Sequence, residues 1–254
     1  MNPKKILYID FGGLGDHLSF STLPEMCHLH GFDFYLSSRS KFRSIETFDL
    51  VWKCNPFFKG MTDETPNCGH CNYTNLEGYN DEISLNKNME EKIGFPESKL
   101  PHGSKYPIIY YWPKVIDDFK DCLLIDLNGV HCSHNGYIYY WNKIKQFIED
   151  DIECNKYSRI FFINSNKINY SEASFNFIIG EPIFIENIFQ YTDMIYSSQK
   201  FITIWAGSSH LASAIKWKFK PELKIFTFSD NTKKSCFWYD NVKYFQGYMT
   251  NLSW

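Results

Sequence analysis

Residues 4–16 read KKILYIDFGGLGD, and this stretch decides the fold. Its first eight residues are mostly apolar, β-branched or aromatic, as is typical of a strand buried in a parallel sheet. A glycine-rich turn follows at Gly12–Asp16, and apolar residues then recur at largely helical spacing up to Gly31. Further along the chain we expect a strand at 32–37, a helix at 38–48 and a strand at 50–54. This alternation predicts the first half of a doubly wound α/β domain.

The alternation of strands and helices restarts after Pro113. The chain before Pro113 has a loop-rich stretch at 55–85, a short helix at 86–95 and one further strand at 108–112. After it we expect strands at 122–127, 159–164, 201–205 and 224–229, a short strand near 177–185, and helices that begin at Trp141, Glu186 and Ala206. The sequence therefore predicts two Rossmann-like doubly wound domains, residues 1–113 and 114–254, facing each other across a cleft.

Composition narrows the class of protein. The chain has 254 residues, 44% of them hydrophobic and 22% charged, so it can bury a core and does not resemble a disordered protein. Its formal net charge of −3 gives no electrostatic reason to expect nucleic acid as a partner. No apolar run reaches the roughly 20 residues that span a bilayer, and the apolar run before Gly12 is too short for a signal peptide. We expect a soluble, cytoplasmic protein without a transmembrane segment.

The first candidate site is the turn Gly12–Asp16. Gly13 and Gly15 let the backbone turn tightly and let a ligand approach closely. The spacing is not the G-x-G-x-x-G of a dinucleotide site, and no acidic residue obviously ends the second strand to bind a ribose. Asp16 has two interpretations: an N-cap that accepts backbone N–H bonds, or a general base with His17 beside it.

A second candidate is the turn Trp205–His210 after the strand at 201–205. Small residues there expose the amides of a helix N-terminus, which bind phosphate oxygens with the help of the helix dipole. Gly207, Ser208, Ser209 and His210 are the candidate donors. The alternative is a tight turn with serine caps and a buried histidine.

Two further sets of residues lie in loops. The loop at 128–137 follows the first strand of the second half, where His131 and His134 could meet phosphate or simply face solvent. Cys68-Gly-His-Cys71 has the spacing of a metal knuckle, which Cys54 and His70 could complete, but no second C-x-x-C exists. The alternative to a metal site is an exposed loop with reduced thiols.

Taken together, these loops resemble glycosyltransferase family 9, the heptosyltransferase-like enzymes of the GT-B fold. The likeness begins with Gly15-Asp16 followed by Thr22-Leu23-Pro24. It continues in FITIWAGSSHLASAI (201–215), which shares the family's glycine, histidine and small-residue pattern at Gly207, His210, Leu211, Ala212 and Ala214. The matches occur in both halves of the chain in the family's order.

The resemblance implies an inverting, metal-independent transfer of a sugar from a nucleotide-diphosphate donor to a hydroxyl of a glycan, lipid-linked or small acceptor. Asp16 would be the general base, Gly13, Gly15 and His17 would shape its loop, and the turn Gly207–His210 would bind the donor diphosphate with His134 nearby. The nucleotide sugar is a co-substrate, and no cofactor is implied.

The sequence also departs from the family pattern. Trp205 stands where heptosyltransferases carry an acidic residue that contacts the donor sugar, and Ala206 replaces the small hydroxyl residue after it. Five residues, not the usual three, separate Asp16 from Thr22. A catalytically degenerate binding protein with this fold, or a nucleotide-sugar epimerase or hydrolase, stays an alternative.

Overall fold

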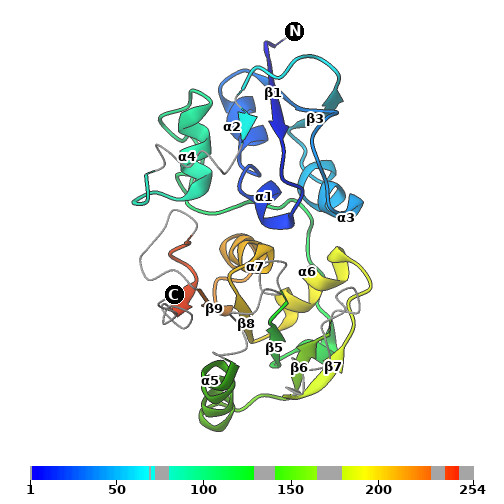
Figure 1. Ribbon diagram of the computed structural model, residues 1–254, viewed down its shortest axis with the longest axis vertical. Coiled ribbons are helices and arrows are strands. Elements are labelled where there is room, and N and C mark those ends of the chain that lie inside the picture. Colours follow the sequence, from blue (N-terminus) through cyan, green and yellow to red (C-terminus); the bar gives the residue numbers. More distant parts are fainter. Residues whose placement is uncertain are drawn as a thin grey trace, which may run out of the picture. The chain divides into compact units, whose positions relative to one another are not determined.

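The computed structural model describes residues 2–68, 70–71, 80–128, 141–164, 179–229 and 238–245. The chain forms two compact units, each with its own parallel sheet (Figure 1). Unit 1 comprises Met1–Trp112 and Ser235–Asp240, and unit 2 comprises Pro113–Lys234 and Asn241–Trp254. No helix among the described residues is long and apolar enough to cross a membrane.

Unit 1 is built on a four-stranded parallel sheet with strand order β3-β2-β1-β4. Its elements are β1 (Lys4–Ile9), α1 (Leu14–Leu18), α2 (Leu23–Leu29), β2 (Asp33–Ser37), α3 (Ile45–Phe48), the π-helical turn η1 (Asp49–Lys53), β3 (Phe58–Thr62), β4 (His70–Cys71) and α4 (Leu85–Lys92). The strands predicted at 4–11 and 32–37 and the helix at 86–95 are confirmed. Ile6, Leu7 and Ile9 of β1 are buried, as a central parallel strand requires.

The strand predicted at 50–54 is wrong, because these residues continue α3 as η1. The helical stretch begins only after Ser44, whose hydroxyl caps Glu46 N at 3.1 Å, so the helix predicted at 38–48 is also shorter than expected. Leu50, Val51 and Trp52 are consecutive and fully buried. A short apolar run of this kind does not distinguish a buried helical turn from a strand. The third strand is instead β3, within the stretch predicted as loop.

The strand predicted at 108–112 is also wrong. Ile108 and Ile109 are buried and Trp112 is exposed, and the segment has no strand partner within the described chain. Ile108 N donates to the Ser21 hydroxyl at 2.8 Å, and the Tyr110 hydroxyl donates to Glu25. Hydrogen bonds to side chains therefore hold this segment, which lies between Pro107 and Pro113, in place of the backbone hydrogen bonds to a neighbouring strand.

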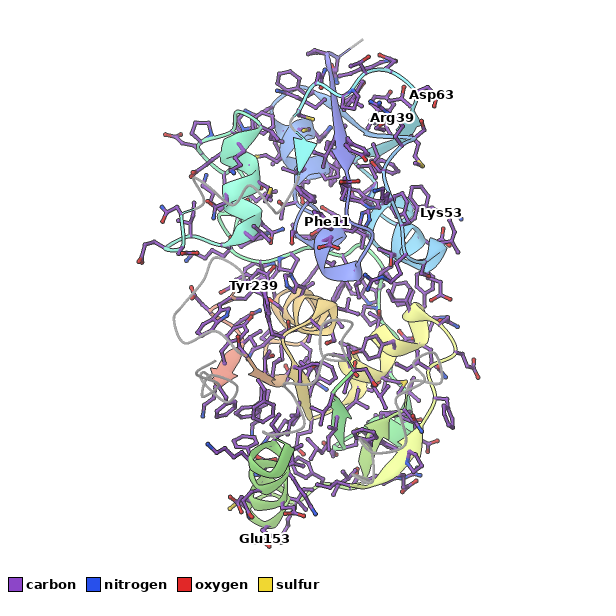
Figure 2. All side chains as sticks on the ribbon, in the orientation of Figure 1. Phe11, Arg39, Lys53, Asp63, Glu153 and Tyr239 are labelled. Atoms are coloured by element: carbon purple, nitrogen blue, oxygen red, sulfur yellow. The ribbon has the colours of Figure 1, made fainter. Side chains whose placement is uncertain are left out.

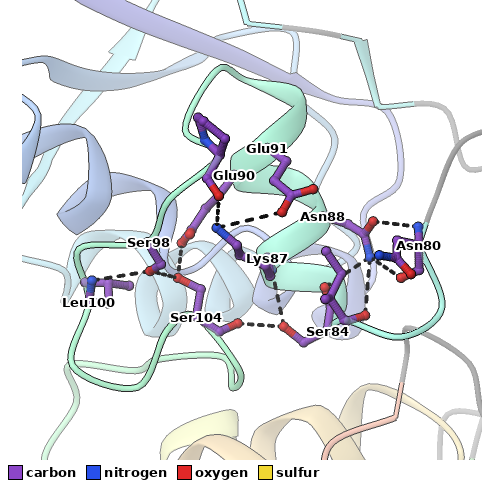
Figure 3. A network of polar contacts seen from close by, with 11 residues as sticks. Asn80, Ser84, Lys87, Asn88, Glu90, Glu91, Ser98, Leu100 and Ser104 are labelled. Atoms are coloured by element: carbon purple, nitrogen blue, oxygen red, sulfur yellow. Dashed lines mark hydrogen bonds and ion pairs between the residues drawn. The ribbon is translucent and has the colours of Figure 1, made fainter.

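Helix α4 is held in unit 1 by a polar network (Figure 3). The Ser84 hydroxyl accepts from Lys87 N at 3.3 Å and donates to Ser104 O at 2.6 Å. Two turns later, the buried Glu90 carboxylate accepts from the Ser104 hydroxyl. Burial raises the pKa of the Glu90 carboxyl. The network fixes the loop after α4 against the helix.

A C-terminal segment completes unit 1. The side chains of Trp238 and Tyr239 are buried, and the Tyr239 hydroxyl donates to Asn86 Oδ1 at 3.4 Å (Tyr239 is labelled in Figure 2). Asn86 Nδ2 in turn donates to Leu18 O at 3.1 Å and Ser19 O at 3.0 Å. Asn86 therefore connects α4 and the C-terminal segment to the end of α1.

Unit 2 has a six-stranded parallel sheet with order β10-β9-β8-β5-β6-β7. Its elements are the single turn η3 (Asp117–Phe119), β5 (Leu123–Asp126), α5 (Trp141–Cys154), β6 (Ile160–Ile163), β7 (Glu181–Ile183), α6 (Ile188–Ser197), β8 (Lys200–Ile204), α7 (Gly207–Lys218), β9 (Lys224–Phe228) and β10 (Lys243–Phe245). The predicted strands and helices of this half are confirmed, and β10 is an additional strand that the sequence pattern missed.

Helices lie on both faces of the second sheet. From β5 the chain moves through α5 to β6 and β7, then crosses back through α6 to β8 on the other side of β5. Because such crossovers are right-handed, α5 lies on one face, and α6 and α7 lie on the other. Ile144 and Ile148 of α5 pack against the apolar core formed by β5, β8 and β9. Charged side chains such as Glu153 of α5 point outward (Figure 2).

Candidate functional site

The topology of each sheet marks one place for a ligand. In doubly wound sheets, ligands bind at the carboxyl ends of the strands where the strand order reverses. In unit 1 this point lies between β1 and β4, and the turn Gly12–Asp16 follows β1 directly. In unit 2 it lies between β5 and β8, and the turn before α7 follows β8 (Figure 1). Both predicted turns therefore stand at a switch point.

Glycine is required at the start of the first turn. Arg43 N donates to Gly12 O at 2.8 Å, and a Cβ on Gly12 would lie only 2.7 Å from Arg43 N. A Cβ on Gly13 would lie 2.8 Å from Asp16 Oδ2. The backbone of this turn thus packs more closely than a side chain allows.

Asp16 lies in the first turn of α1 and is half-buried. Its Oδ2 accepts from Gly13 N at 2.8 Å, so the carboxylate caps the helix N-terminus. Gly15 contributes its carbonyl, which accepts from Ser19 N and the Ser19 hydroxyl within the helix. The cap fixes the orientation of the carboxylate, and a carboxylate has further lone pairs with which to accept a proton.

His17 is buried, and both of its ring nitrogens are hydrogen-bonded inside unit 1. Trp52 Nε1 donates to Nδ1 at 2.9 Å, and Nε2 therefore carries the proton and donates to Lys41 O at 2.9 Å. The ring also stacks on Phe42 with centroids 4.4 Å apart. Burial lowers the pKa of His17 to about 4, so the ring is neutral at pH 7. His17 holds the loop and offers no ring nitrogen to a ligand.

The second turn presents backbone amides. Ala206 is the extended N-cap of α7, and its carbonyl accepts from Ser209 N at 3.0 Å and the Ser209 hydroxyl at 2.8 Å. Within the described part of the chain, Gly207 N and Ser208 N have no acceptor. Two amides and the positive end of a twelve-residue helix dipole are thus available for an anion.

The side chains of this turn point inward. The Ser208 hydroxyl lies 2.7 Å from the Thr203 hydroxyl, and the Ser209 hydroxyl is occupied by Ala206 O. His210 is buried, and burial lowers its pKa to about 4. A neutral imidazole adds no positive charge at pH 7, so the backbone amides are the principal anion donors of the turn.

The structure adds two residues that sequence analysis missed. Asp126 ends β5, pairs in register with Thr203 of β8, and is 5% exposed. The hydroxyl of Tyr191 on α6 donates to Asp126 Oδ2. The polar end of the predicted strand 122–127 is the signal that could have identified Asp126. No feature of the sequence near Tyr191 identifies it as a partner of Asp126, which is 65 positions away.

His131 and His134 lie outside the described residues, as do the side chains of His70 and Cys71. Cys68 is buried, and burial raises the pKa of its thiol to about 11, which disfavours the thiolate that binds metal. Across the described stretches of chain, no group of three His, Cys, Asp or Glu side chains is arranged to hold a metal ion.

No protein-family model matches this chain, and no curated protein sequence matches it. Several solved structures, in contrast, are similar to this chain. The bacterial iron-containing dodecameric glycosyltransferase TibC from enterotoxigenic E. coli H10407 aligns over 94% of this chain and 62% of its own, with a TM-score of 0.60 and 15% identity. The chain has the fold of this glycosyltransferase.

Two further structures agree. The glycosyl transferase family 9 protein from Veillonella parvula DSM 2008 aligns over 96% of this chain and 85% of its own, with a TM-score of 0.54 and 7% identity. The E. coli heptosyltransferase WaaC with ADP aligns over 97% and 95%, with a TM-score of 0.52 and 7% identity. The resemblance to family 9 drawn from the two turns is thus confirmed for the fold. The chain spans less than two thirds of TibC.

Proposed function

We propose that the protein transfers a sugar from a nucleotide-diphosphate donor to an acceptor hydroxyl, with inversion at the anomeric carbon and without a divalent cation. In this proposal residues 1–113 hold the acceptor and residues 114–254 the donor, on opposite sides of a shared cleft. The observation that carries it is the pair of turns at the two switch points of a fold shared with glycosyltransferases. One turn carries a carboxylate and the other offers amides for an anion.

Asp16 is the proposed general base. It takes the proton of the acceptor hydroxyl as that oxygen bonds to the anomeric carbon, and the bond from this carbon to the diphosphate oxygen breaks. The hydrogen bond from Gly13 N holds the carboxylate in one orientation, which lowers the cost of aligning base and acceptor.

The turn before α7 is the proposed diphosphate site. Negative charge grows on the leaving diphosphate, and the Gly207 and Ser208 amides with the helix dipole stabilise it. Fixed dipoles can thereby replace a divalent cation. TibC is described with ADP-D-β-D-heptose and WaaC with ADP, which makes ADP the first nucleotide to test.

The test compares wild-type protein with Asp16→Asn, using an ADP-sugar with candidate acceptors. The amide oxygen of the substituted side chain can still accept from Gly13 N, so the helix cap survives while the base is lost. We expect turnover to fall roughly 10²–10⁴-fold with ADP affinity unchanged. Asp49→Asn, which removes a partly exposed carboxylate paired with the exposed Lys53, is the matched control and should keep full turnover. Wild-type turnover in Asp16→Asn would remove Asp16 from the mechanism.

A second candidate is a nucleotide-sugar-binding protein without turnover. Trp205 and Ala206, which stand where the family carries an acid and a hydroxyl, favour it. The same assay separates the two: binding of ADP with no transfer to any acceptor supports the binding protein. Release of ADP without an acceptor would indicate a hydrolase.

A further inference from the structure

Arginine is rare in this chain, and two of its three arginines lie in one short segment of unit 1. The sequence has 26 lysines and arginines together, of which Arg39, Arg43 and Arg159 are the arginines. Arg159 forms an ion pair with Glu181 in unit 2. The other two belong to the segment 38–44, SRSKFRS, which carries three cations and no acidic residue. Lysine would supply the same charge, so the use of arginine favours a partner that the guanidinium can bind with two hydrogen bonds.

Backbone hydrogen bonds fix the segment 38–44 against the carboxyl end of β1. Lys41 N donates to Ile9 O at 2.9 Å, and Arg43 N donates to Gly12 O at 2.8 Å. Between these two residues, the Phe42 ring stacks on the buried His17. The segment therefore has a fixed place beside the turn Gly12–Asp16.

The cations of this segment are its exposed side chains. Ser40 is buried, whereas Arg39, Lys41 and Arg43 are exposed to solvent (Arg39 is labelled in Figure 2). Lys41 forms an ion pair with Asp10 at 2.6 Å. No ion pair of Arg39 or Arg43 occurs within the described part of the chain. The two arginines therefore give this side of unit 1 a positive charge that an anion can meet.

Arg43 lies close to the proposed base. A Cβ built on Gly13 would lie 4.0 Å from Arg43 Nη1 and 2.8 Å from Asp16 Oδ2. The guanidinium and the carboxylate are thus both neighbours of the same glycine. A ligand that meets both groups has a hydroxyl for Asp16 and an anion for Arg43, and the two belong to one sugar unit or to adjacent units.

We propose that the acceptor is an anionic sugar whose carboxylate or phosphate binds Arg43, and that Arg39 strengthens the attraction. Both anions match the planar fork of a guanidinium. The contact holds the sugar so that its hydroxyl meets Asp16, and it selects anionic acceptors over neutral ones. This inference rests on the proposed function, because it takes Asp16 as the base that faces the acceptor.

In this proposal Arg43 determines specificity and Asp16 carries out the proton transfer. Loss of Arg43 should therefore raise KM for an anionic acceptor and leave kcat nearly unchanged. A guanidinium that merely supported the Asp16 carboxylate would affect kcat with every acceptor, charged or neutral. The ratio of the two kinetic constants separates these roles.

The test is an NMR titration of the nitrogen-15-labelled protein at pH 6, following the Arg43 Nε–H signal and the backbone amides of the turn Gly12–Asp16. The probes are methyl glucuronide, which carries a carboxylate, glucose 6-phosphate, which carries a phosphate, and methyl glucoside, which is neutral. We expect the signals to respond to at least one anionic sugar, with methyl glucoside at least tenfold weaker. Arg43→Gln should weaken the binding of that anionic sugar roughly 10- to 100-fold, as followed by the turn amides, and leave the neutral sugar unchanged.

Arg159→Gln is the matched control, because Arg159 is the arginine of unit 2 that is paired with Glu181. It should keep the wild-type affinity for each sugar. Equal binding of neutral and anionic sugars, no binding of either anionic sugar, or anionic binding that survives Arg43→Gln overturns the anionic acceptor. A stronger response of the Arg43 signal to ADP than to either anionic sugar assigns the guanidinium to the donor and also overturns it. These outcomes leave sugar transfer itself to be decided by the turnover of Asp16→Asn, which keeps Arg43.

Discussion

Replacing Asn86 by alanine should destabilise the helix that carries Asp16. Asn86 is fully buried, and its amide donates to Leu18 O and Ser19 O at the end of α1. Leu18 O keeps other donors, Ser21 N and the Ser21 hydroxyl. Ser19 O has no second donor within the described part of the chain.

The magnitude follows from this difference. An orphaned buried carbonyl costs about 1–3 kcal/mol, and a lost bond to a carbonyl with other donors costs about 0.5–1.5 kcal/mol. Asn86→Ala should therefore lower the free energy of unfolding of unit 1 by about 2–4 kcal/mol. Tyr239→Phe loses only a hydrogen bond of 3.4 Å and should cost less than about 1 kcal/mol.

The assay is urea unfolding with hydrogen exchange of the α1 amides measured by mass spectrometry. Asn67→Ala is the matched control, because Asn67 also makes two backbone bonds, to Ile6 N and Lys4 O, but is exposed to water. Water can replace those bonds, so the loss should be smaller and α1 exchange unchanged. A loss below about 0.5 kcal/mol in Asn86→Ala, or equal losses in both variants, would refute the reasoning.

Two further predictions concern buried charges. Lys200 and Asp151 form an ion pair with side chains 4% and 11% exposed. Lys200→Met should therefore lower the free energy of urea unfolding by about 3–5 kcal/mol, and adding Asp151→Asn should restore most of that free energy. If the double variant restores none of it, the lysine acts through packing. Because burial raises the pKa of Glu90, wild-type stability should fall as pH rises from the unfolded pKa near 4.5 through the folded value. The loss should be about 1.4 kcal/mol for each pH unit that separates the folded and unfolded pKa values. Glu90→Gln should remove this loss, and parallel stability curves between pH 4 and 8 would contradict it.

The parts of the fold that follow local patterns could be predicted from the sequence. β1, β5 and β8 are buried apolar runs followed by small or polar turns, and each is recognisable for that reason. The apolar run at 50–54 and the aromatic run at 108–112 resemble strands because an apolar run reports burial and not backbone conformation. Their true conformation depends on Ser44, Ser21 and Glu25, which lie elsewhere in the chain.

The candidate site divides in the same way. The two turns are identifiable from glycine and small residues next to strands, which is a local signal. That His17 is held by Trp52, 35 positions away, and that the Ser208 hydroxyl faces Thr203 are facts of tertiary packing. No spacing within the sequence encodes them, so the roles of these side chains required the structure.

The most direct test of the donor site is a thermal-shift screen of the purified protein against ADP, UDP, GDP and CDP. A nucleotide at 100 times its Kd should add about 2.7 kcal/mol to the stability of the protein, which is enough to move a melting curve by several degrees. We expect selective stabilisation by one of the four. A well-folded protein that responds to none of them would contradict the diphosphate site at the α7 turn and, with it, sugar transfer from a nucleotide donor.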